Sequence, residues 1–93
     1  MYARIATFEG ATGDVKAAMQ QATADGPPEG LKSSEAYFFA DSGSGKSIFV
    51  TFFETEDDMK AGDALLGQMS PDDAGIGRRV GVDLMEVVAH MTA

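Results

Sequence analysis

Two neighbouring segments, residues 36–40 and 48–53, carry large apolar side chains at both odd and even positions. They are joined by the Ser/Gly-rich residues 41–46, which tolerate the backbone conformations of a tight turn, so the three segments predict a β-hairpin. Because side chains alternate faces along a strand, Phe52 must point to one face of the sheet and Phe53 to the other. Both faces of the predicted sheet therefore need an apolar cover.

The chain has 93 residues, which we interpret as a single domain spanning 1–93. A chain of this size buries only about 60 to 65% of the surface that its unfolded form exposes, so its own core is modest. Two short amphipathic helices can cover one face of a sheet, and the other face needs a partner, most simply a second copy of the chain. We therefore expect a homodimer formed through the helix-free face of the sheet.

The charge and the composition exclude several classes of partner and site. Fifteen acidic and seven basic residues give a net charge of −8, which repels phosphate backbones and anionic lipid, so we expect neither nucleic acid nor membrane as a partner. The absence of cysteine excludes disulfides, thiolate catalysis and zinc-thiolate sites. No apolar run approaches the ~20 residues of a membrane span, and we expect a soluble, cytoplasmic protein.

The remaining segments complete the order of elements. Tyr2 to Phe8 predicts a first strand, and apolar spacings of three, four and seven predict helices within Thr12 to Asp25 and Thr55 to Met69. Val80 to His90 is too rich in β-branched residues for a third helix and predicts the last strand, bent either near Gly81 or around Asp83 to Glu86. The order β-α-β-β-α-β predicts an α+β fold of the ferredoxin-like type, with a four-stranded antiparallel sheet and both helices on one face.

Three features together resemble the antibiotic-biosynthesis-monooxygenase-like family. They are the opening strand at Met1 to Ile5, the turn at Gly45-Lys46, and the junction Phe52 to Asp58, which joins a strand to an acidic helix start. The resemblance covers essentially the whole chain and implies a dimeric α+β barrel, in which two helix-free sheet faces pack against each other. The family contains cofactor-free monooxygenases that form quinones, haem-degrading enzymes and members with no assigned activity.

The residue sets of the two enzymatic groups are not present. The haem-degrading members use an Asn, a Trp and a His that follows the second helix, whereas this chain has neither Asn nor Trp, and its sole histidine, His90, lies in the last predicted strand. Of the Asn, Trp, Tyr and Arg of the polyketide-oxidising members, only the Tyr and Arg types remain. Two functions stay open: a cofactor-independent monooxygenase acting on a phenolic or quinonoid molecule, and a non-catalytic ligand-binding or dimeric assembly module.

Tyr37 and His90 are the candidate catalytic residues, as hydrogen-bond donor and proton acceptor. Histidine is the side chain that ordinarily titrates near neutral pH, so a general-base mechanism would use His90 first. No serine or cysteine nucleophile is spaced beside it, and we favour the structural interpretation of His90 over the catalytic one.

The candidate pocket for a small aromatic ligand lies between the sheet and the helices, with Arg4, Phe39, Phe52 and Met59 in its lining. Arg4 would orient an anionic or phenolic group, and methionine adapts to irregular shapes. The alternative is that the aromatic residues fill the core and the dimer interface, while Arg4 pairs at the surface with one of the many acidic residues.

We expect no metal and no other cofactor. One histidine with scattered carboxylates is a poor transition-metal site, and the acidic residues 54–63 lie at a helix start instead of in a calcium-binding loop. Residues 42–47 imitate a phosphate-binding loop, but Ala40 stands where that motif needs glycine and a strand follows where it needs a helix. We interpret this segment as a hairpin turn.

Overall fold

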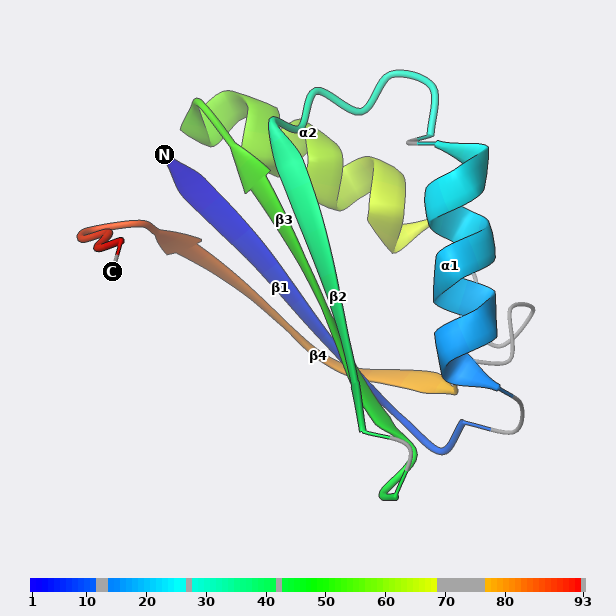
Figure 1. Cartoon of the computed structure of the whole chain (residues 1–93). Helices are drawn as coiled ribbons and strands as arrows, with labels where there is room; N and C mark the ends of the chain where they lie inside the picture. The colour runs from blue at the N-terminus through cyan, green and yellow to red at the C-terminus, as the bar shows by residue number, and fades with distance from the viewer. Residues whose placement is uncertain (12–13, 27, 42, 69–76, 93) are drawn as a thin grey trace.

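The structure is a computed structural model and describes residues 1–11, 14–26, 28–41, 43–68 and 77–92. The elements are β1 (Tyr2–Glu9), α1 (Val15–Asp25), β2 (Glu35–Asp41), β3 (Lys46–Phe53), α2 (Glu56–Gly67) and β4 (Arg78–Glu86). The strands form one antiparallel sheet in the order β2-β3-β1-β4, which confirms an α+β fold with a four-stranded antiparallel sheet and two helices (Figure 1).

Both helices lie on the same side of the sheet, and no helix among the described residues covers the opposite side (Figure 1). The strand register fixes which residues share a face. The helix-covered face carries the even-numbered residues of β1 and β2 and the odd-numbered residues of β3, and the helix-free face carries the others. Ala6 and Phe53 are completely buried on the covered face.

Helix α1 begins and ends at local signals in the sequence. The carboxylate of Asp14 accepts a hydrogen bond from the backbone N–H of Ala17 at 3.1 Å, which caps the first turn. Gly26 ends the helix with φ of 83°, a conformation that glycine adopts without steric cost. The helix therefore begins at Val15, directly after its cap. The start of the predicted segment, Thr12, lies outside the described residues.

Helix α2 begins at a side-chain cap. The hydroxyl of Thr55 accepts from the backbone N–H of Asp58 at 3.1 Å. At the other end, the guanidinium of Arg79 donates to the carbonyls of Leu66 at 3.4 Å and Gly67 at 3.2 Å. A cation is favourable at the negative end of a helix, so Arg79 joins α2 to β4. The predicted end of this helix at Met69 lies outside the described residues.

The turn between β2 and β3 confirms the hairpin interpretation. Asp41 closes it through its side chain, which accepts from the backbone N–H of Gly43 at 3.1 Å and from the hydroxyl of Ser44 at 3.0 Å. Gly45 has φ of 69°, which favours glycine at that position. The turn is therefore held by its own side chains.

The last strand is shorter than predicted. β4 ends at Glu86, so His90 lies beyond it and the expectation of a strand to His90 is wrong. The physical reason is the partner strand: the Cα partner of Glu86 is Tyr2, the first residue of β1, and later residues have no strand beside them. The register between β1 and β4 shifts between Thr7 and Phe8, opposite Gly81, where the sequence predicts a bend.

Candidate functional site

The sheet divides the predicted site residues into separate groups. Tyr37, Phe39 and Phe52 have their side chains on the helix-free face. Arg4 and Met59 lie on the other side, between the sheet and α2. The structure therefore does not bring these residues together into one pocket.

The helix-free group is an aromatic cluster on the surface. The ring of Tyr37 lies 6.3 Å from that of Phe39 and 6.1 Å from that of Phe52, measured between centroids, and meets the latter edge-on. Tyr37 is 49% exposed and Phe39 is 54% exposed. Rings in such arrangements attract one another beyond their burial, so the cluster is an ordered apolar surface.

Arg4 is the most unusual residue of the covered face, because it is a charged side chain only 2% exposed. Its Nε donates to Oδ1 of Asp63 at 2.8 Å. Met59 lies one helical turn before Asp63, on the same face of α2, and is buried. Arg4 is thus paired with an acidic residue, as the alternative interpretation expected, but its side chain is buried and not at the surface, where that interpretation placed the pair.

His90 lies four residues after the end of β4, and its side chain is exposed. Its neighbours Val88 and Met91 are among the most exposed apolar side chains of the chain. The structure therefore shows no packed environment around His90 and no group among the described residues that would orient its ring.

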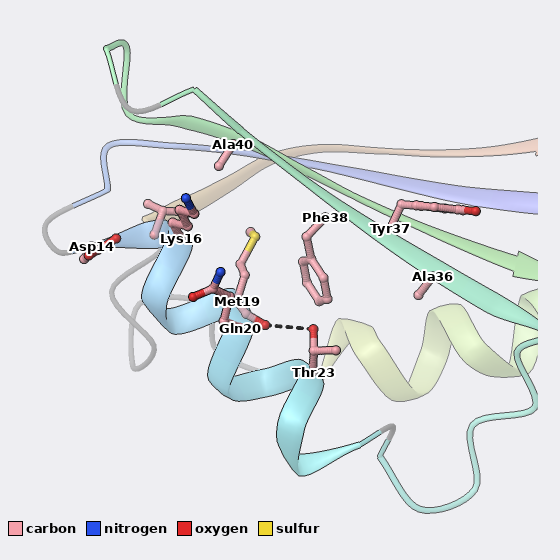
Figure 2. Close-up of a pocket in the computed structure, with 10 residues that line it drawn as sticks. Asp14, Lys16, Met19, Gln20, Thr23, Ala36, Tyr37, Phe38 and Ala40 are labelled. Carbon is pink, nitrogen blue, oxygen red and sulfur yellow. Dashed lines mark hydrogen bonds between the residues drawn. The ribbon is translucent and has the colours of Figure 1, made fainter.

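A cleft of about 670 Å³ lies between α1 and the edge strand β2. Figure 2 shows Met19 of α1 and Phe38 of β2 facing each other across it. Its lining is Asp14, Val15, Lys16, Met19, Gln20, Thr23, Ala36, Tyr37, Phe38 and Ala40. Volumes of 300 to 1,000 Å³ or so are typical of small-molecule sites.

Aromatic packing forms the floor of this cleft. The ring of Phe38 lies parallel to that of Phe49, with 4.3 Å between centroids and 3° between planes. Tyr37 belongs to the lining, but its ring points away from α1 (Figure 2) and packs against the ring of Phe52 on the helix-free face. The sequence predicts a pocket between the sheet and the helices, but its predicted lining does not mark this place beside α1; the signal for it is the pair of small residues, Ala36 and Ala40, on either side of Phe38.

The polar groups of the cleft come from α1. The carboxylate of Asp14 is used as the helix cap, and the hydroxyl of Thr23 donates to the carbonyl of Met19 at 2.9 Å (Figure 2). Lys16 and Gln20, one turn apart on the helix, are exposed. The cleft thus has an apolar floor and a polar rim, the usual construction of a small-molecule site.

Within the described ranges, no group of three His, Cys, Asp or Glu side chains is placed to hold a metal ion. No helix in this part of the chain has the length and apolarity needed to cross a membrane. Comparison of the chain with protein-family models, with curated proteins and with solved structures finds no match.

Proposed function

We propose that this protein is a homodimer that binds a small aromatic molecule in the cleft between α1 and β2 of each subunit. The two subunits pack through their helix-free sheet faces, as in the dimeric α+β barrels of the antibiotic-biosynthesis-monooxygenase-like family, and the strand order β2-β3-β1-β4 supports the ferredoxin-like plan of that group. The observation that carries the proposal is the aromatic cluster of Tyr37, Phe39 and Phe52, which lies on a face that no helix covers.

The exposed area supports a partner. The chain exposes 6211 Å², whereas compact monomers of this mass expose about 5,200 Å². On the helix-free face, Tyr37 is 49% exposed, Phe39 54% and Met85 52%.

The cleft supports binding of a planar aromatic ring. Phe38 and Met19 face each other across it, and sulfur and aromatic groups both attract aromatic rings. Of the pair predicted for a cofactor-free oxygenation, Tyr37 directs its ring away from α1 and His90 is not part of the cleft lining. Among the two functions that the sequence leaves open, the geometry therefore favours ligand binding over catalysis.

The proposed dimer is tested by sedimentation-velocity measurements over a range of protein concentrations. We expect the wild type to sediment as a dimer, and Phe39→Glu to sediment as a monomer with the same helix content by circular dichroism, because it places a charge in the apolar interface. Ala24→Glu adds the same charge to an exposed position of α1 and should leave the dimer intact. A wild type that sediments as a monomer at every concentration would refute the proposal.

A further inference from the structure

The strand β2 forms one edge of the sheet, and in the part of the chain that the structure describes no strand lies beside its outer side. In an antiparallel pair, the backbone N–H and C=O groups of alternate residues point to the neighbouring strand, and those of the other residues point away from it. Between Ala36 and Ala40, the described residues form no backbone hydrogen bonds except those with β3. The outer edge of β2 therefore offers a row of unpaired donors and acceptors.

This edge lacks the features that protect exposed strands from further pairing. Such features include a β-bulge, a proline or a lysine in the strand. The pairing of β2 with β3 runs from Glu35 to Asp41 without a shift of register, and the residues between these two are all uncharged and include no proline. The other edge strand, β4, shifts its register opposite Thr7 and begins with Arg78 and Arg79. Of the two edges, β2 is therefore better suited to receive a further strand.

The cleft beside α1 gives access to the backbone of this strand. Tyr37 lines the cleft although its ring points away from α1 (Figure 2), so the part of Tyr37 that reaches the cleft is its backbone. Ala36 and Ala40 also line the cleft, and their single methyl groups leave the backbone accessible on either side of Phe38. The cleft thus has the backbone of an edge strand on one wall and the apolar Met19 on the other, which suits an extended peptide that binds by strand addition.

Charge distinguishes between a second copy of the chain and a different polypeptide as the added strand. Two β2 strands paired antiparallel about Phe38 would place Glu35 of each copy opposite Asp41 of the other, and like charges in directly opposite positions are destabilising. A segment with basic residues at these two positions would instead face both carboxylates. The net charge of −8 also favours a basic partner.

We propose that the cleft binds an extended, basic segment of another polypeptide, which pairs with the outer edge of β2 as a fifth strand. This inference rests on the proposed function, because it uses the same cleft, and it names the ligand class: a peptide with an aromatic residue at its centre and a basic residue three positions before and after it. Residues directly opposite each other share a face of the sheet. The aromatic residue opposite Phe38 therefore points to the covered face, where Met19 lies across the cleft (Figure 2), and the basic residues lie opposite Glu35 and Asp41.

The test uses the peptide acetyl-Lys-Thr-Thr-Phe-Thr-Thr-Lys-amide in isothermal titration calorimetry. We expect it to bind about tenfold more tightly than acetyl-phenylalanine-amide, which has the ring without a strand, and than the same peptide with glutamate at both ends. Hydrogen exchange of the backbone amides, followed by NMR, should slow at alternate residues of β2 when the peptide is added. The exchange of β4 amides should not change.

Glu35→Lys should remove most of the preference for the lysine-ended peptide, because it places like charges opposite each other. Glu86→Lys is the matched control. It makes the same change of charge at an exposed residue, at the end of the other edge strand, and should leave the preference intact.

If acetyl-phenylalanine-amide binds and the peptide binds no more tightly, this inference is overturned and the proposed function stands. Equal binding of the lysine-ended and glutamate-ended peptides would overturn the charge argument and with it the inference. Peptide binding without slower exchange in β2 would overturn it as well. Exchange in β2 that slows with protein concentration alone would show a second copy at this edge, against the inference. If neither the amino acid amide nor the peptide binds, the proposed function fails, and this inference fails with it.

Discussion

The two faces of the sheet are built from the same strands but differ in how far their side chains are buried and in what those side chains contact. On the covered face, the ring of Phe53 is completely buried against α2, and Arg4 is paired with Asp63. On the helix-free face, Tyr37 and Phe39 are about half exposed and contact mainly each other and their neighbours in the sheet. The comparison teaches that apolar character alone does not distinguish the face that forms the core from the face that no described helix covers.

If the covered face determines the stability of the subunit, its buried charge should give the largest effect. We expect Asp63→Ala to lower the free energy of unfolding by about 3 kcal/mol, because it leaves the buried Arg4 guanidinium without its partner. Arg4→Met should cost less, about 1 kcal/mol, since the side chain of Asp63 is 38% exposed and can be hydrated. Urea unfolding followed by circular dichroism measures both, and the reverse order would contradict this account of the pair.

Smaller changes in stability should distinguish the two faces of the sheet at Phe38 and Phe39, which are adjacent in β2. Phe38→Ala removes a half-buried ring that stacks on Phe49, and we expect a loss of about 2 kcal/mol. Phe39→Ala should lower the melting temperature by an amount that grows with protein concentration, because it weakens association instead of the subunit core. Thermal unfolding at several concentrations measures both deficits relative to wild type. A deficit for Phe39→Ala that is independent of concentration would contradict the assignment of its face to an interface.

The smallest effect concerns the tight packing of α2 on the covered face. A Cβ added at Gly62 would lie 2.5 Å from Cε1 and Cζ of Phe53 and 3.3 Å from Cδ1 of Leu31. We expect Gly62→Ala to lower the free energy of unfolding by about 1 kcal/mol, because this clash outweighs the gain in helix propensity. Gly67→Ala, in the same helix with nothing within 4 Å of the added atom, should raise stability slightly. Denaturant unfolding measures both variants. If both were more stable than the wild type, the packing argument would be contradicted.

Much of the fold could be predicted because its signals are local. Asp41 and Gly45 mark the hairpin turn, and Thr55 marks the start of α2, all within a few residues of the groups that they bond. The end of β4 could not be predicted, because it depends on where its partner β1 begins to pair. The sequence of one strand does not show which residues of another strand it will pair with.

The site was harder to predict for the same reason. Arg4 and Asp63 are 59 positions apart in the chain, and no spacing rule connects them. Phe38 and Phe39 are the same residue type in adjacent positions, so the sequence shows that they face opposite ways but not which of them meets α1. The cleft depends on the distance between α1 and β2, which is set by packing between elements and not by any motif.

The cleft takes one of its walls from β2, a strand at the edge of the sheet that is held by hydrogen bonds along one side only. Such a wall can move outward by small amounts without breaking the central pairing of β1 with β3, where Arg4 and Thr51 stand. The width of the cleft can therefore adapt to its occupant at the cost of small shifts in one edge strand, without a change in the centre of the sheet.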